Sequence, residues 1–223
     1  MKKTLLSAIA IMVFISLSLT GCGNDHNNAT PTIVTSILSN SALDGDILVP
    51  QVGSPSVVQG MSVSKQSVFA GIDPAAPFDE FRAFLDFPLT GANGVPGNAV
   101  IVSATLDIVI DSVQSLASTI PIRIDLVSFQ PPILLATDFD LGIQPALATT
   151  TILISSANVA VNPHVLVDVT SLMEEAQNRV LPDFQVRILQ DPSVVAPPGL
   201  IEIDDTTGAN RTLLAPLLQV QYF

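Results

Sequence analysis

The sequence predicts an all-β domain, an antiparallel β-sandwich or jelly roll of about nine strands with one short helix. Apolar residues recur at every second position over much of the chain. Such alternation places one row of side chains inside and one row toward water. Turns rich in proline and glycine, of which the chain has 17 and 12, separate the alternating runs. Many short strands punctuated in this way are typical of sandwiches and jelly rolls rather than of a parallel sheet.

The longest alternation lies at residues 100–111, where valine, alanine, leucine and isoleucine hold the even-numbered positions. Residues 120–127 repeat the pattern, and their odd-numbered row, with Arg123 and Asp125, is expected to face water. In residues 81–87 the odd-numbered row is apolar and faces away from the row that contains the charged residues. The other predicted strands are residues 67–71, 150–155, 165–169, 184–189, 200–203 and 217–222.

One helix is expected to interrupt the strands, at about residues 171–179. Ser171 followed three residues later by Glu174 fits a capping box, in which serine accepts from a backbone amide and glutamate reaches back. Leu172, Ala176 and Val180 would then share one face of the helix.

The first 22 residues have the order of a secretory signal: a basic head at Lys2 and Lys3, an apolar run, and a small-residue cleavage point. The run is shorter than the roughly 20 residues that span a membrane. Its end, Leu19-Thr20-Gly21-Cys22, resembles the lipobox of bacterial lipoproteins. That resemblance implies cleavage before Cys22, acylation of Cys22, and a lipid-anchored protein of the cell envelope. Gly23, in place of an aspartate after the cysteine, favours the outer membrane, with the domain facing the periplasm or the surface.

Three regions follow from this pattern. Residues 1–21 are the signal peptide, residues 22–58 are the lipidated cysteine and a tether, and residues 59–223 are the β-sandwich. The segment 33–38 is either a first strand or a continuation of the tether. Because Cys22 is the only cysteine in the sequence, the predicted domain has no intramolecular disulfide.

The charge balance of the mature chain excludes one class of partner. Without Lys2 and Lys3, 6 of the 8 basic residues remain against 20 acidic ones, so the net charge is −14. Nucleic acid requires a basic face, and this chain cannot supply one. The acidic balance keeps an exported domain soluble and repels it from anionic lipid beyond its tether.

Three segments carry a resemblance to a known domain family. They are the run RAFLDF at 82–87 with PGNAVIVSATL at 96–106, the step VDVT at 167–170, and the ending IEID at 201–204 with PLLQVQY at 216–222. Over residues 60–223 this order resembles the DNRLRE-type modules, disaggregatase-related β-sandwiches of secreted bacterial and archaeal proteins. The resemblance implies a sandwich fold and, because some relatives are carbohydrate-binding modules, glycan binding as an alternative function.

Residues with catalytic potential are few. His164 begins a predicted strand and could pair with an acid across the sheet, but no G-x-S-x-G or H-E-x-x-H motif accompanies it. Glycan sites usually stack sugars on aromatic rings, and the chain has no Trp and only one Tyr. Loop acids provide oxygen ligands of the type that calcium prefers. These calcium candidates are Asp138, Asp140, Asp204 and Asp205.

The sequence therefore predicts an envelope-anchored lipoprotein that presents a non-enzymatic β-sandwich for protein interaction or surface structure. It needs no cofactor beyond a structural calcium ion. The alternatives are a cell-surface carbohydrate-binding module and, third, a glycoside hydrolase that uses a carboxylate pair.

Overall fold

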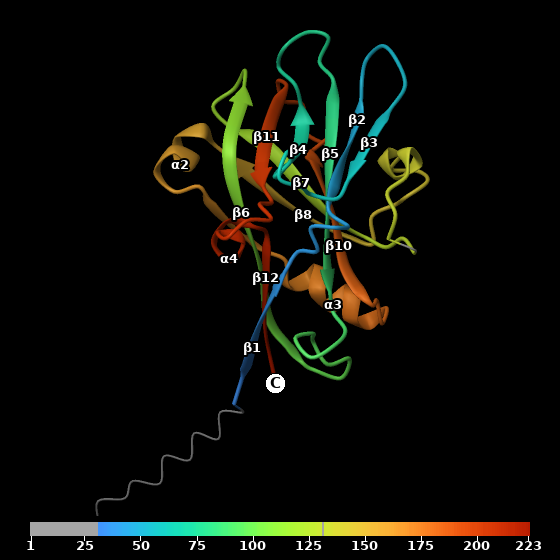
Figure 1. Ribbon diagram of the computed structural model, residues 1–223, viewed down its shortest axis with the longest axis vertical. Helices are drawn as coiled ribbons and strands as arrows, with labels where there is room; N and C mark the ends of the chain where they lie inside the picture. The colour runs from blue at the N-terminus through green and yellow to red at the C-terminus, as the bar shows by residue number, and fades with distance from the viewer. Residues whose placement is uncertain (1–30, 131) are drawn as a thin grey trace, which may run out of the picture. The chain divides into compact units, whose positions relative to one another are not determined.

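The computed structural model describes residues 31–130 and 132–223, of which Thr32–Phe223 form one compact unit. The unit is an antiparallel all-β fold, as the sequence predicts, and Figure 1 shows its arrangement. The strands are β1 (Ile33–Leu38), β2 (Gly45–Val49), β3 (Ser56–Gln59), β4 (Ser67–Ile72), β5 (Glu80–Pro88), β6 (Ile101–Ser115), β7 (Ile120–Val127), β8 (Ala148–Ile154), β9 (His164–Asp168), β10 (Asp183–Gln190), β11 (Gly199–Asp204) and β12 (Leu217–Tyr222). The helical elements are η1 (Ala136–Phe139), α2 (Ser156–Val161), α3 (Thr170–Asn178) and α4 (Arg211–Leu214).

The strands form one curled, sandwich-like sheet in the order β1-β12-β6-β11-β4-β5-β10-β7-β8. Strand β9 pairs with β6, β2 pairs with β5, and β3 pairs with β2. Strand β6 is 15 residues long, so one half pairs with β12 and β9 while the other half pairs with β11. This shared strand joins the two halves of the sheet and lets them enclose one core.

The core consists of the inward rows that the alternation predicts. Ile120, Ile122, Ile124 and Leu126 of β7 are all at most 1% exposed. Helix α3 covers one end of this core with Leu172, Met173 and Ala176. Burying side chains of this size is worth roughly 1.5–3 kcal/mol each, so these rows hold the fold together.

The number of strands is larger than the sequence predicts, and the domain begins earlier. Segment 33–38 is a strand, β1, that pairs with β12 over its whole length. Strands β2 and β3 lie within the predicted tether, and β2 pairs with β5. The boundary at residue 59 is therefore wrong, and the folded unit begins at Thr32. At Gly45 a Cβ would lie 2.2 Å from the carbonyl oxygen of Val58, which explains a glycine where β2 meets β3.

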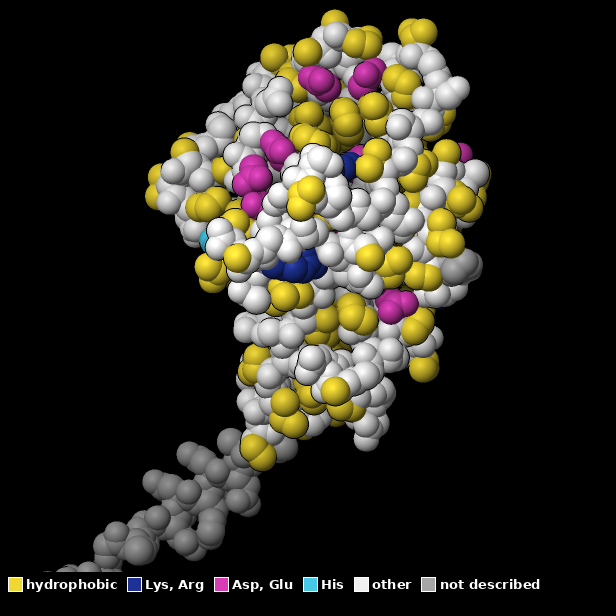
Figure 2. Space-filling view, viewed as in Figure 1, with side chains coloured by type: hydrophobic (Ala, Val, Ile, Leu, Met, Phe, Trp, Pro, Cys, Tyr) yellow, Lys and Arg dark blue, Asp and Glu magenta, His cyan; other side chains and the backbone are white. Residues whose placement is uncertain are grey.

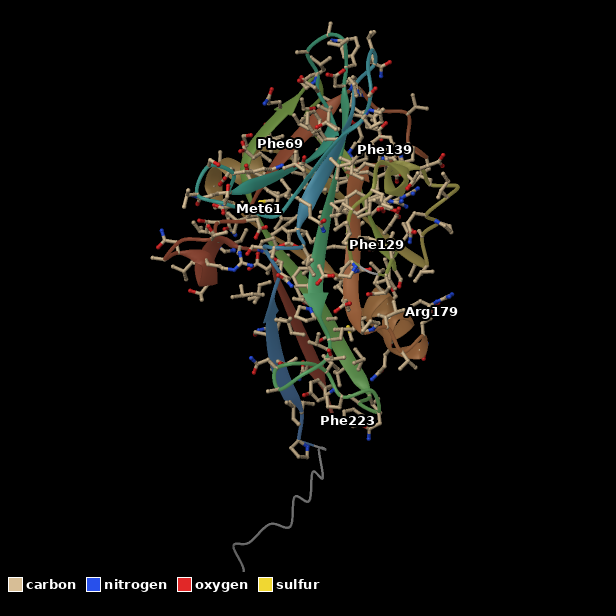
Figure 3. The ribbon with its side chains drawn as sticks, turned by 45° about the vertical axis from the view of Figure 1, so that its right-hand side comes forward. Met61, Phe69, Phe129, Phe139, Arg179 and Phe223 are labelled. Carbon is tan, nitrogen blue, oxygen red and sulfur yellow. The ribbon has the colours of Figure 1, made fainter. Side chains whose placement is uncertain are left out.

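The rows expected to face away from the core on β5 and β7 are also buried, and so is the row of β10 that contains Gln185 and Arg187. Asp125 has no exposed surface, and Arg82 and Asp86 are at most 7% exposed. The segment between β7 and β8 and the hairpin of β2 and β3 cover this second face, where Ile47, Phe84 and Leu134 form a small second core. Figure 3 shows Phe129 and Phe139 at the edge of this core, and the rings of Phe84 and Phe129 pack edge to face.

The prediction of one helix is correct for α3, but its capping box is wrong. The helix begins at Thr170, and the carboxylate of Asp168 accepts hydrogen bonds from the Thr170 amide (2.9 Å) and from its hydroxyl (2.6 Å). An aspartate that accepts the amide two residues on forms a tight turn, here just before the helix, whose N-cap position Val169 has no side-chain hydrogen bond. These bonds lower the pKa of Asp168 below its ordinary value. The short helices α2 and α4 and the turn η1 are additional to the prediction and lie in connections between strands.

Candidate functional site

The predicted lipobox residues Leu19, Thr20, Gly21 and Cys22 lie outside the described residues. Acylation of Cys22 therefore stays a prediction. The described chain enters the fold at Thr32, immediately before β1. Among residues 31–130 and 132–223, no helix is long and apolar enough to cross a membrane.

The four calcium candidates lie in two separate turns, and three of them accept backbone amides of their own turns. Asp138 accepts from the amide of Leu135 (2.8 Å), Asp140 from that of Gly142 (2.7 Å), and Asp204 from that of Thr206 (2.7 Å). Asp205 instead binds Arg211. Within the described part of the chain, no group of three or more His, Cys, Asp or Glu residues has a geometry that could hold a metal ion. The geometry thus assigns these acids to local structure.

His164 pairs with an acid across the sheet. Its Nδ1 lies 3.1 Å from both carboxylate oxygens of Asp107 on β6. The imidazole also lines a hollow of about 280 Å³ beside Ser155 and Asn162. In the described residues, the hydrogen bonds of the ring go to Asp107, and the serine hydroxyl accepts the amide of Ala157 instead. The pair is half-exposed, and exposed pairs of this kind contribute little to stability.

The most unusual polar feature is a buried pair of carboxyl groups, Asp44 and Asp205, neither of which has exposed surface. The two carboxyl groups lie close enough for the charge of Asp205 to act on Asp44, and one oxygen of each, Oδ2, has no hydrogen-bond partner among the described residues. Asp44 also accepts the amide of Asp86 (2.7 Å), and Asp205 accepts from Arg211 (3.1 Å) and Ser39 (3.3 Å). Because Arg211 pairs with Asp205 and not with Asp44, ionisation is disfavoured more strongly at Asp44.

Burial and then the neighbouring charge of Asp205 raise the pKa of Asp44 well above its ordinary value. Burial also raises the pKa of Asp46 and Asp86. An unfolded chain ionises such carboxyls near pH 4, so the folded state holds more protons above that pH. Stability contributed by these groups is complete at acidic pH and is lost as the pH rises through the raised values.

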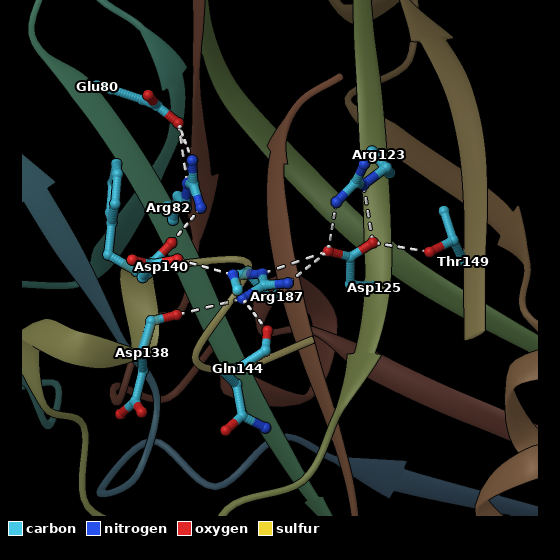
Figure 4. A network of polar contacts seen from close by, with 11 residues as sticks. Glu80, Arg82, Arg123, Asp125, Asp138, Asp140, Gln144, Thr149 and Arg187 are labelled. Atoms are coloured by element: carbon cyan, nitrogen blue, oxygen red, sulfur yellow. Dashed lines mark hydrogen bonds and ion pairs between the residues drawn. The ribbon is translucent and has the colours of Figure 1, made fainter. Parts of the chain in front are cut away.

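A second buried network holds the segment between β7 and β8 against the sheet (Figure 4). Arg187 of β10 has no exposed surface and donates to Asp125 (2.8 Å) and to the carbonyls of Asp138 (3.2 Å) and Gln144 (2.9 Å). Arg123 forms a second ion pair with Asp125, and Thr149 donates to the same carboxylate (2.9 Å). The guanidinium of Arg187 thus fixes a segment of irregular structure through its backbone.

Arg82 of β5 binds the same segment. It pairs with Glu80 at 2.7 Å, donates to the carbonyl of Phe139, and lies 3.8 Å from the centre of the Phe139 ring. Burial lowers the pKa of Arg187, an effect that Asp125 opposes, and an arginine remains charged under such conditions. Together the two arginines hold η1 in one position on the outer face of the sheet.

The end of the domain where the chain enters has a different character, and we call it the entry end. It consists of residues 32–38, 89–102 and 218–223, which are joined by the pairing of β1 with β12 and of β12 with β6. None of these residues has a charged side chain. Figure 2 shows this end with hydrophobic and uncharged side chains on the visible face, whereas the acidic side chains lie farther along the domain.

The entry end exposes several large apolar side chains, between 44% and 55% each: Ile33, Val34, Val100, Val102 and Phe223. Phe223 exchanges backbone hydrogen bonds with Val100 (2.9 and 3.2 Å). In Figure 3, Phe223 lies near the start of β1, while the charged Arg179 lies farther along the domain. The entry end is therefore the place where apolar surface from three neighbouring strands is exposed together.

Three hollows surround the β5–β6 connection at this end. One of about 200 Å³ lies between the connection and α3, and its lining includes Leu89, Val95 and Met173. The others, of about 390 and 200 Å³, lie beside β1 and β12; Thr90 of the same connection lines the larger one and Pro96 lines the smaller one. All three hollows are open to solvent, so they are depressions of the surface and not enclosed small-molecule sites.

Sequence reasoning missed Asp44, Arg187 and the entry end. Nothing in the local sequence of Asp44 signals its pairing with a residue 161 positions away. Arg187 stands on the odd-numbered row of β10 with Asp183 and Gln185, and polar side chains at alternate positions indicate a face toward water, so the local sequence does not signal its burial. The entry end could have been found from the absence of charge in residues 88–106 and 212–223. No family model matches this chain, and no curated protein matches it either.

Proposed function

We propose that this protein is a lipid-anchored envelope protein whose β-sandwich-like domain is held at the membrane surface for interaction with another protein. The observation that carries the proposal is the spacing between two features. Gly21-Cys22 closes an apolar run, and the folded domain begins ten residues later, at Thr32. An acylated Cys22 would therefore hold the domain directly beside the bilayer.

The net charge of the chain favours attachment through a covalent lipid over direct adsorption to the membrane surface. A mature net charge of −14 repels anionic lipid, so a covalent lipid has to supply the attachment. One acyl chain gives only marginal, reversible binding, and stable anchoring takes two. The diacylglycerol that a lipobox cysteine receives would meet that requirement.

The buried networks support a binding role for the domain. Arg82 and Arg187 hold the long β7–β8 segment in one conformation, and a pre-ordered surface loses less entropy when a partner binds. The four acids considered for calcium accept hydrogen bonds from their own turns or bind an arginine, so they hold the turns in place. A scaffold with a fixed outer surface suits the proposed binding role.

Fatty-acid labelling of growing cells tests the anchor. The wild-type protein should incorporate an alkyne-bearing fatty acid, whereas Cys22→Ala should incorporate none. Gly23→Ala, which keeps the cysteine, is the matched control and should be labelled like the wild type. Equal labelling of Cys22→Ala and wild type, or no labelling of either, would contradict the proposal.

A second experiment tests the interaction. The wild-type protein and Gly23→Ala are treated with a cell-impermeant crosslinker in intact cells or in cells with a permeabilised outer membrane. We expect a discrete adduct of constant mass with both proteins. A chain recovered only as a monomer under every condition would contradict a protein-binding role.

A further inference from the structure

We propose that the entry end of the domain rests on the lipid surface, with Val34, Val100 and Val102 in the headgroup region. The inference depends on the proposed lipid anchor and goes beyond it, because an anchored domain could equally remain clear of the bilayer. It assigns a lipid surface as the occupant of the exposed apolar residues at this end. The inference follows from three observations, on charge, on exposed apolar surface and on where the chain enters.

The absence of charged side chains distinguishes the entry end from the other surfaces of the domain. Envelope membranes are rich in anionic lipids, whose surface potential repels acidic protein surfaces. The chain has 20 acidic and 8 basic residues, yet the three segments of the entry end, residues 32–38, 89–102 and 218–223, contain neither kind. These three segments meet at one end of the fold through the β1–β12 and β12–β6 pairings. Approach to the bilayer by this end avoids the repulsion that the acidic surfaces would meet.

The apolar residues at this end lie on neighbouring strands. Val34 stands opposite Gln221 in the β1–β12 ladder, and Gln221 stands opposite Ser103, next to Val102 on β6. Val34 and Val102 are 55% and 44% exposed, and Val100 beside them is 53% exposed. Gln221 and Ser103 lie between these valines, so the surface exposes apolar side chains among uncharged polar ones. Exposed apolar groups gathered among polar residues are characteristic of surfaces that bind a protein or a membrane. The amide and hydroxyl groups here can bond to phosphate and glycerol oxygens.

The position of the chain entry identifies a membrane as the occupant. Ten residues separate Cys22 from Thr32, and such a segment spans at most about 36 Å. Thr32 lies in the entry end, and its hydroxyl accepts a hydrogen bond from Gln221 (3.0 Å). The end through which the chain enters is therefore tied closest to the bilayer. The β2–β3 connection lies at the opposite end of the domain (Figure 1).

Fluorescence quenching by lipid tests the proposal on the full-length, lipidated protein. Single cysteines replace Val34 or Val102, and each is labelled with an environment-sensitive fluorophore, since an acylated Cys22 cannot react. The matched control is Val52→Cys, which is 86% exposed in the β2–β3 connection. Each protein is reconstituted into vesicles of phosphatidylethanolamine and phosphatidylglycerol that contain a lipid with a nitroxide near its headgroup. Flotation of the vesicles reports anchoring independently.

We expect several-fold stronger quenching at positions 34 and 102 than at position 52. Adding Val100→Asp should reduce the quenching at position 34, whereas adding Ser54→Asp at the far end should not. Proteins that float with the vesicles but show equal, weak quenching at all three positions would overturn this inference and leave the anchor intact. Proteins that do not float would overturn the proposed anchor and the inference with it.

Discussion

Replacing Arg187 with methionine should be among the most damaging single changes in this domain. The side chain is fully buried, and its charged group forms four hydrogen bonds to three oxygen atoms. It donates to Asp125 through two nitrogens, at 2.8 and 3.3 Å, and to the carbonyls of Asp138 and Gln144. Methionine fills much of the same volume and leaves the remaining partners without a donor.

The expected loss of stability depends on the partners that Asp125 keeps after the substitution. Removing one partner of a buried ion pair costs about 3–5 kcal/mol, because it leaves a buried charge uncompensated. Asp125 retains Arg123 and Thr149, which favours a value of about 3 kcal/mol, the lower end of that range. Arg123→Met should cost only about 1 kcal/mol, since Arg123 is partly exposed and Asp125 retains Arg187. Most domains have a free energy of unfolding of about 5–15 kcal/mol, so the loss of about 3 kcal/mol at Arg187 is a large fraction of the total stability.

Urea unfolding followed by circular dichroism measures the effect, because the chain has no tryptophan and a single tyrosine. The double variant Arg187→Met with Asp125→Leu should be about 2 kcal/mol more stable than the sum of the two single effects predicts, since it removes the buried charge as well. The reasoning fails if Arg187→Met lowers the free energy of unfolding by less than about 1 kcal/mol. Strict additivity in the double variant would refute it as well.

Three further predictions concern stability. The raised pKa values of Asp44, Asp46 and Asp86 mean that the free energy of unfolding should fall from mildly acidic to mildly alkaline pH. Asp44→Asn, which imitates the protonated acid, should flatten this profile in urea titrations across pH, and an unchanged slope would contradict the raised pKa of Asp44. Asp168→Ala should remove the turn that precedes α3 and cost about 1 kcal/mol in urea unfolding, and Asp168→Asn should restore most of it. Gly71→Ala should lower the free energy of unfolding by about 2 kcal/mol or more, because φ is +119° there and a Cβ would lie 2.1 Å from the Gly199 carbonyl oxygen; a thermal midpoint equal to the wild type would disprove this.

Strands with clear alternation could be predicted almost to the residue. Segments 33–38 and 217–222 coincide with β1 and β12, and 120–127 coincides with β7. Segments 120–127 and 217–222 each have a full apolar row, and burial of that row determines both the strand and its register. Thr35 and Ser36 interrupt the rows of segment 33–38, so its sequence fits a tether as well as a strand. Strands β2 and β3 are only five and four residues long, too short to display a period. They form because β5 offers an unpaired edge, a condition that their own sequences do not contain.

The candidate site could be predicted only in part. Local sequence identifies the Gly-Cys leader and the turn acids, because both depend on neighbouring residues. The pairing of Asp44 with Asp205, the contacts of Arg187, and the meeting of three charge-free segments at the entry end depend on residues far apart in the chain. Charged residues on alternating rows indicate an exposed face, so the second, buried face of β5 and β7 was expected to lie away from the core. Apolar residues on the same rows, such as Phe84 and Val127, were the evidence in the sequence that this face is buried.

The most direct test of the account is the mass of the N-terminal peptide of the protein isolated from membranes. Proteolysis followed by mass spectrometry should recover a peptide that begins at Cys22 and carries a diacylglyceryl group. Its mass should shift with the fatty-acid composition of the host. A peptide that retains residues 1–21, or one that begins at another residue with no lipid attached, would contradict the lipid anchor and the placement of this domain at the membrane.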